Sequence, residues 1–87
     1  MKYYVYILYS ESINKYYIGY STNVPNRLIF HNSEEYNKIW TKRGIPWELK
    51  FQQEFPTKSE ALKTERFIKK QKNKKFIERI ISEGWNS

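Results

Sequence analysis

The chain has 87 residues, the length of one small domain, which we expect to span residues 1–87. Its 16 Lys and Arg residues outnumber 9 acidic residues and give a net charge of +7, which favours a polyanionic partner such as nucleic acid. The lack of cysteine excludes disulfides and thiolate metal sites, and the single histidine excludes a multi-histidine zinc site. All the acidic residues are glutamates, so aspartate chemistry is excluded too. No signal peptide or membrane-spanning run is recognisable, and we expect a cytoplasmic protein without a membrane partner.

Two aromatic strands are predicted near the N-terminus, over residues 2–9 and 15–20, with a short polar turn between them. Seven of the eight tyrosines lie in or beside these strands, and most of them are interpreted as packing residues. Bulky side chains alternate on both faces of the first strand, which predicts a central strand that is covered on both sides. Gly19, near the end of the second strand, lacks a side chain and would let another backbone or a ligand approach closely.

A short helix is predicted from about residue 24 to residue 31 or 32, with Asn23 as its N-cap. Arg27 and His31 are four residues apart and therefore lie on one face of this helix. Arginine can donate two parallel hydrogen bonds to a phosphate, and histidine can transfer protons near neutral pH. The same pair would also suit an ordinary helix surface, so both interpretations stay open.

Residues 47–55 alternate between apolar and polar side chains, which predicts an edge strand with one buried face. The basic segment before it, residues 33–44, is ambiguous and could hold one amphipathic turn. A capping-box pattern at residues 57–60 begins a helix that is expected to end near residue 70. A last helix is predicted over residues 74–82, with Gly84 at its C-cap.

Glu65 lies on the apolar stripe of the helix that follows the capping box, four residues after Ala61 and three before Ile68. Burying a carboxylate is costly unless something pairs with it. The carboxylate could pair with a nearby Arg or Lys, or the helix could be rotated enough to expose it. It could instead bind Mg²⁺, which often takes only one or two protein carboxylates. Residues 69–75 contain five lysines, which indicates either a solvated helix junction or sequence-independent contacts to phosphates.

Taken in order, these residues resemble the GIY-YIG nuclease superfamily. The resemblance is closest to the small single-domain members related to the nuclease domain of the excision-repair endonuclease. Tyr4-Val5-Tyr6 corresponds to the first motif, with tyrosine in place of its glycine, and Tyr17-Ile18-Gly19 corresponds to the second. Arg27 and His31 match the family's Arg-x-x-x-His helix, and Glu65 matches its metal-binding glutamate. Each triplet alone is weak, but the combination spans nearly the whole chain.

The resemblance implies an α+β fold, with a small three-stranded antiparallel sheet flanked by helices, and metal-dependent hydrolysis of DNA phosphodiester bonds. Glu65 would hold Mg²⁺, with Mn²⁺ as a substitute, and Arg27 would stabilise charge on the phosphoryl oxygens. Tyr6 and Tyr17 would face the phosphate, one of them activating or positioning water, and His31 would support that proton transfer. The identity of the general base stays open. Contacts to the nucleic-acid backbone are expected from Lys42, Arg43, Lys69, Lys70 and Lys72.

We therefore predict an endonuclease that selects DNA by structure rather than by sequence, in DNA repair or recombination. RNA is an alternative substrate, because both backbones are polyanions. The main alternative function is a nucleic-acid-binding module without catalysis, because 87 residues leave no room for the separate DNA-binding domain that many members carry. A protein partner would then supply the targeting. A third alternative is a partner-binding protein whose basic face is incidental, which would show no salt-dependent binding to DNA.

Overall fold

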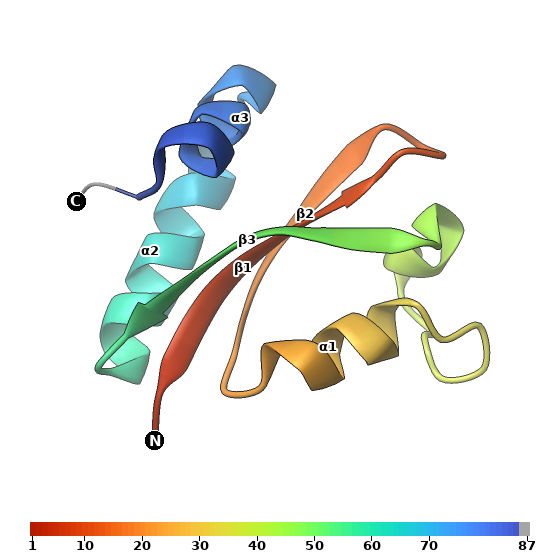
Figure 1. Cartoon of the computed structure of the whole chain (residues 1–87), viewed down its shortest axis with the longest axis horizontal. Helices are drawn as coiled ribbons and strands as arrows, with labels where there is room; N and C mark the ends of the chain where they lie inside the picture. The colour runs from red at the N-terminus through yellow and green to blue at the C-terminus, as the bar shows by residue number, and fades with distance from the viewer. Residues whose placement is uncertain (86–87) are drawn as a thin grey trace.

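The structure is a computed structural model that describes residues 1–85, and it confirms the three-stranded antiparallel sheet. The strands are in the order β2-β1-β3, so the first strand is central, as predicted. Figure 1 shows α2 and α3 on one side of the sheet and α1 on the other. Within residues 1–85, no helix has the length and apolar character needed to cross a membrane. The elements, in chain order, are β1 (Tyr3–Ser10), β2 (Lys15–Ser21), α1 (Val24–His31), the 3₁₀ helix η1 (Trp40–Gly44), β3 (Trp47–Phe55), α2 (Lys58–Gln71) and α3 (Lys74–Glu83).

The sheet divides the apolar side chains into two cores. One core packs β1 against α2 and α3 and includes Ile7, Ile68 and Ile80. The other lies on the α1 side and is built around Tyr6, Leu8, Val24 and Trp47. Successive residues of a strand point to opposite faces, and the alternating bulky residues of β1 therefore supply both cores.

The third strand differs from its prediction, although its bounds agree. A β-bulge shifts the register between β1 and β3, so that Ile7 pairs with Phe51 and Leu8 pairs with Leu49. Because a bulge adds one residue to a strand, the side chains after it point to the opposite face of the sheet from the one that regular alternation would give. Trp47 and Leu49 consequently pack on the α1 side, whereas Phe51 packs toward α2. The expected single buried face is wrong, and β3 contributes to both cores.

Local sequence signals set the ends of the helices. The Asn23 side chain accepts a hydrogen bond from the Asn26 backbone at the start of α1, and Thr57 accepts one from the Glu60 backbone at the start of α2. Such caps satisfy backbone N–H groups that have no partner inside the helix. Between α2 and α3, Lys72 adopts a left-handed conformation, and Gly84 closes α3 as expected.

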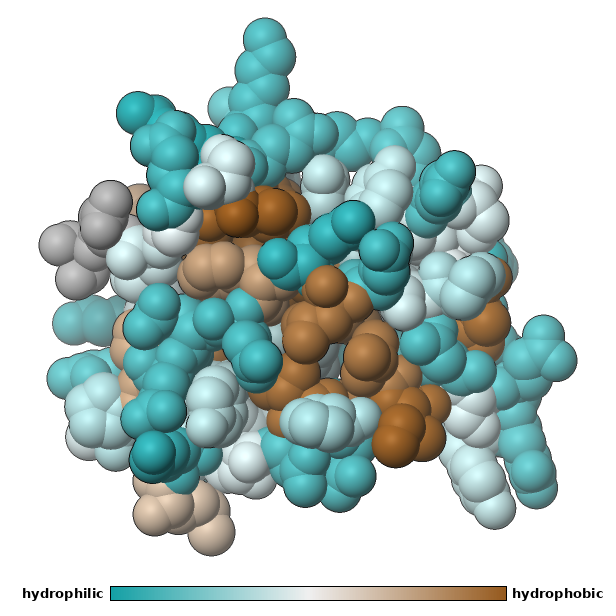
Figure 2. Space-filling view, in the orientation of Figure 1, coloured by the Kyte–Doolittle hydropathy of each residue, from teal (hydrophilic) through white to brown (hydrophobic). Residues whose placement is uncertain are grey.

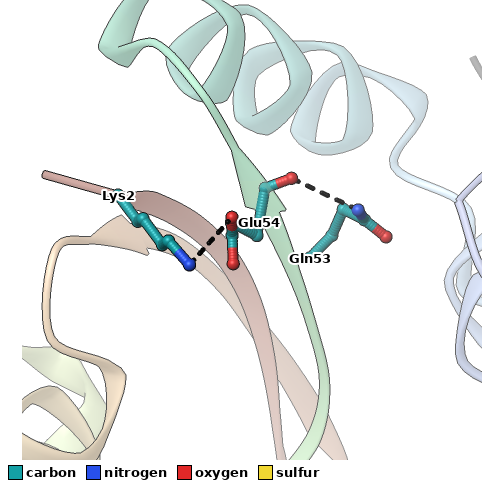
Figure 3. A network of polar contacts seen from close by, with 3 residues as sticks. All are labelled: Lys2, Gln53 and Glu54. Carbon is teal, nitrogen blue, oxygen red and sulfur yellow. Dashed lines mark hydrogen bonds and ion pairs between the residues drawn. The ribbon is translucent and has the colours of Figure 1, made fainter.

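The surface carries charges outside the two cores. Figure 2 shows hydrophilic residues over most of one face of the molecule, with hydrophobic residues gathered near its middle. In Figure 3, Lys2 just before β1 forms an ion pair with Glu54 on β3, at 3.6 Å, and Gln53 donates a hydrogen bond to the Glu54 backbone oxygen. Both charged side chains are well exposed, so this pair contributes at most about 1 kcal/mol.

The core on the α2 side gives a direct test of the packing. Replacing Ile68 with Ala removes a side chain that is 1% exposed, and we expect the free energy of unfolding to fall by roughly 2–5 kcal/mol. Ile29→Ala is the matched control, because Ile29 on α1 is 69% exposed, and its change should stay within about 0.5 kcal/mol. Urea denaturation measures both variants. Equal changes would contradict the assignment of α2 to the core.

Candidate active site

Tyr6 and Tyr17 come from neighbouring strands and lie on the same face of the sheet. Tyr6 pairs with Gly19 across the hairpin, and Leu8 pairs with Tyr17. The two tyrosine rings are 6.1 Å apart between centroids. A Cβ atom on Gly19 would lie 2.7 Å from the Tyr6 hydroxyl and 2.9 Å from the Tyr17 ring. The glycine therefore makes room for the tyrosines themselves, and not for another backbone or a ligand as its position in the sequence had suggested.

Helix α1 places Arg27 and His31 beside these tyrosines. The Tyr6 hydroxyl forms a hydrogen bond with His31 Nε2 at 3.2 Å, and the Tyr17 ring centroid is 4.5 Å from the His31 ring. The Arg27 guanidinium lies over the Phe30 ring at 4.4 Å, and its charge acts on both Tyr6 and His31. Four of the five predicted catalytic residues therefore meet on the α1 side of the sheet.

The histidine is fully buried, which excludes the ordinary helix surface as its environment. Its second nitrogen, Nδ1, forms a hydrogen bond with Thr41 Oγ1 at 3.0 Å. Asn37, also fully buried, donates one hydrogen bond to the His31 carbonyl and another to Thr41 Oγ1, at 2.9 and 2.8 Å. Trp47 on β3 donates its indole N–H to the Thr41 carbonyl at 2.6 Å. The segment between α1 and β3 thus supplies the hydrogen-bond partners of the buried His31, rather than forming an amphipathic turn.

Burial controls the protonation of this cluster. Burial raises the pKa of Tyr6 to about 12, although the nearby Arg27 acts in the opposite direction. Burial and the positive charge of Arg27 together lower the pKa of His31 to about 4. At neutral pH the phenol is therefore protonated and the imidazole is neutral. A neutral ring can accept a hydrogen bond on one nitrogen while it donates on the other.

Glu65 lies on α2, on the other side of the sheet. Its side chain is 14% exposed and forms an ion pair with Lys69 Nζ at 3.6 Å. The same Nζ atom is 6.0 Å from the centroid of the Tyr17 ring, so the ion pair lies beside this tyrosine. Within residues 1–85, no group of three or more His, Cys, Asp or Glu side chains could hold a metal ion. Glu65 can therefore offer a cation one carboxylate, with water and substrate oxygens as the other ligands.

Four of the five predicted backbone contacts, Lys42, Arg43, Lys69 and Lys72, line two hollows. The first, called here the Arg43 hollow, has a volume of about 570 Å³ and is lined by Asn37, Lys38, Ile39, Trp40, Lys42 and Arg43. The second, the Lys69 hollow, has a volume of about 290 Å³ and is lined by Tyr16, Tyr17, Ile18, Trp40, Ile68, Lys69, Lys72 and Ile77. Trp40 lines both, whereas Lys70 is exposed at the end of α2 and lines neither.

Sequence reasoning missed Asn37, Thr41 and Trp40 as parts of this site. Asn37 and Thr41 are uncharged polar residues in a segment otherwise rich in lysine and aromatic residues. A buried histidine needs a hydrogen-bond partner for each ring nitrogen. Burial of His31 would therefore have pointed to the uncharged polar residues in this segment. Trp40 carried no such signal, because its position depends on the fold of the whole segment.

The sequence matches the GIY-YIG catalytic domain family over residues 2–78. It is 40% identical over 83 residues to UPF0213 protein SSP2268 from Staphylococcus saprophyticus, covering 95% of this chain and 98% of that one. A UPF0213 protein from Streptococcus pneumoniae is 38% identical over 71 residues, covering 82% and 70%. The solution NMR structure of the UPF0213 protein BH0048 from Bacillus halodurans has a TM-score of 0.57 and 32% identity, covering 94% and 84%.

The buried histidine predicts a specific dependence of stability on pH. The pKa of His31 falls from 6.5 when unfolded to about 4 when folded, so between these values the unfolded chain binds the extra proton. Stability should therefore decrease as the pH falls from 6.5 toward 4, by up to about 3 kcal/mol. Chemical denaturation at several pH values measures this decrease. Since the chain has a single histidine, NMR can follow its ring without ambiguity.

The control for this titration is His31→Gln, which removes the titrating ring. The variant should be less stable at pH 7, because Tyr6 and Thr41 lose a partner. Between pH 6.5 and 5, however, its stability should change less than that of the wild type. A histidine with an ordinary pKa, or equal slopes in the two proteins, would contradict the buried neutral state.

Proposed function

The chain belongs to the GIY-YIG family, and from this premise we propose that it is a metal-dependent endonuclease that hydrolyses DNA phosphodiester bonds. The observation that carries the proposal is the meeting of Tyr6, Tyr17, Arg27 and His31, which come from β1, β2 and α1, in one hydrogen-bonded and aromatic cluster. Only the tertiary structure brings these residues together, and they supply a fixed positive charge and proton-transferring groups. Both kinds of group can assist the hydrolysis of a phosphodiester.

Arg27 is proposed to bind the scissile phosphate. An arginine guanidinium can donate parallel hydrogen bonds to two phosphoryl oxygens. The Phe30 ring beneath it limits the directions that the side chain can take. The charge that develops on the phosphoryl oxygens would consequently meet a donor that is already in place.

Tyr6 and His31 are proposed to act as a proton relay. Thr41 Oγ1 already accepts a hydrogen bond from Asn37 and can also accept one from His31 Nδ1–H. In that tautomer, Nε2 accepts the hydrogen bond of the Tyr6 hydroxyl. The phenol could then take a proton from an attacking water while it passes its own proton to His31. Tyr17, beside both rings, would position that water.

Glu65 is the proposed ligand for Mg²⁺ or Mn²⁺. A bound Mg²⁺ would supply a Lewis acid that polarises the phosphate. The single, largely buried carboxylate fits a cation that takes its remaining ligands from water and substrate. Lys69 now balances its charge and would turn toward a phosphate when the carboxylate binds the cation. We propose structure-selective cleavage in DNA repair or recombination as its role, and the cytoplasm as its location.

The Glu65–Lys69 ion pair also favours a second candidate function, a nucleic-acid-binding module without catalysis. A carboxylate that already has a lysine partner needs no metal ion. The basic residues around the two hollows would then bind the nucleic-acid backbone, and a partner protein would provide any cleavage. The two functions differ in one result, which is cleavage by the purified protein.

We expect the purified protein to cut branched or nicked DNA with Mg²⁺ or Mn²⁺, and EDTA to stop the reaction. Tyr6→Phe removes the hydroxyl that bonds His31 and should lower the rate by roughly 10²- to 10⁴-fold. Glu65→Gln removes the charge that holds the cation and should leave no measurable cleavage. Gel assays on branched, nicked and intact duplexes measure these rates.

The matched controls lie in the loop after α1, where Tyr36→Phe and Glu35→Gln change exposed side chains. Both should retain the wild-type rate. Equal residual cutting by the wild type and Glu65→Gln would contradict the assigned role of Glu65. DNA binding that persists in every variant, without cleavage by the wild type under either metal, would favour the non-catalytic module.

A further inference from the structure

We propose that Trp40 is a stacking platform for an unpaired nucleobase of the DNA substrate, next to the phosphate that is cut. Trp40 lines both the Arg43 hollow and the Lys69 hollow, and we call it the ridge between them. The side chain is 48% exposed although it is a large aromatic residue. Base–aromatic stacking is the usual way in which proteins hold single-stranded nucleic acid.

The ring is held in a fixed orientation before any ligand binds. It packs edge-on against Trp47 at 5.8 Å and 80°, and it packs tilted against Tyr17 at 6.0 Å and 56°. The next residue, Thr41, is fully buried and bonded to His31, which anchors the backbone behind the ring. A ring that is already ordered loses little conformational entropy when a base stacks on it.

The charges on the two sides of the ridge suit a nucleic-acid backbone. Lys42 and Arg43 line one hollow, and Lys69 and Lys72 line the other. No carboxylate belongs to the described residues that line either hollow, although Glu65 pairs with Lys69 from outside the Lys69 hollow and would have to release it to a phosphate. A strand that crossed Trp40 would therefore have cationic side chains for the phosphates on both sides of the stacked base. Such an alternation of cations and an aromatic ring is typical of single-strand binding.

An unpaired base fits this ridge better than an intact duplex does. Bases in a duplex are stacked on their neighbours, so their faces are not free to lie on a protein ring. The Tyr17 ring, which contacts both Trp40 and His31, connects the ridge to the candidate active site. This inference rests on the proposed function for the identity of the partner. It adds a physical reason for selecting DNA by structure, because only an unpaired nucleotide could use the ridge.

The test is a binding measurement in EDTA, where no cleavage is expected. One labelled duplex carries a short single-stranded thymidine tail, a second is fully paired with the same number of phosphates, and a third carries the tail with abasic sites. The wild type should bind the thymidine tail more tightly than the other two. Trp40→Ala should reduce this preference by roughly 5- to 150-fold, the range that stacking of one base represents.

Two further variants separate stacking from folding. Trp40→Phe retains a ring and should keep most of the preference, whereas Trp40→Leu retains apolar contacts with Tyr17 and Trp47 and should lose it. Tyr36→Ala is the matched control, because Tyr36 is an exposed aromatic residue that precedes η1 and lines neither hollow. Circular dichroism should show the same helix content in all the variants. Lys42→Ala and Lys72→Ala should weaken binding to the three DNAs equally and lower the salt dependence.

The results separate this inference from the proposed function. Equal binding of the tailed and paired DNAs by the wild type, equal binding of the thymidine and abasic tails, or an unchanged preference in Trp40→Leu would each overturn the stacking role. Cleavage with Mg²⁺ would still support the endonuclease in those cases. A preference that depends on Trp40 without any cleavage would support the platform and count against the catalytic proposal.

Discussion

The buried imidazole of His31 organises the α1 side of this protein. A fully buried ring nitrogen needs a partner, and His31 has Tyr6 on one nitrogen and Thr41 on the other. Asn37 ties the His31 carbonyl to the Thr41 hydroxyl, and Trp47 binds the Thr41 carbonyl. These bonds join β1, α1, η1 and β3 beside the apolar core that Tyr6, Leu8, Val24 and Trp47 form on the same side of the sheet. Losing one partner would leave several buried polar groups without hydrogen bonds, and so the network fixes the geometry of the tyrosines and of Trp40 together.

The sheet supports this arrangement because it is covered on both faces. The β-bulge in β3 sends Trp47 toward α1 and Phe51 toward α2. A regular strand would have placed both rings on one face, so that Trp47 could not reach Thr41 while Phe51 packed toward α2. The central strand contributes Tyr6 to one core and Ile7 to the other. The site is thus built on β1, which is hydrogen-bonded to a neighbouring strand along each edge. Such a rigid support suits groups that must be positioned accurately.

Two cationic side chains, Arg27 and Lys69, lie beside the aromatic cluster. Arg27 lies close enough to Tyr6 and His31 to lower the pKa of both, although burial remains the larger effect for each. Lys69 Nζ lies 3.6 Å from the Glu65 carboxylate and 6.0 Å from the centroid of the Tyr17 ring. The high pKa of the buried phenol and the low pKa of the imidazole follow from one rule, that burial disfavours the charged form of either group. Tyr6 and His31 are therefore uncharged at neutral pH beside the positive charge of Arg27, which is an arrangement suited to receiving an anion.

The sequence by itself determined the elements of the fold and the order of the candidate residues. Alternating aromatic residues set the strands, and caps at Asn23, Thr57 and Gly84 set helix ends. These signals are readable in the sequence because they act over a few neighbouring residues. Only the tertiary structure decided that β3 faces both cores, that His31 is buried, and that Trp40 separates two basic hollows. Those outcomes depend on contacts between residues far apart in the chain, such as His31 with Tyr6 and Trp40 with Tyr17, which no local pattern encodes.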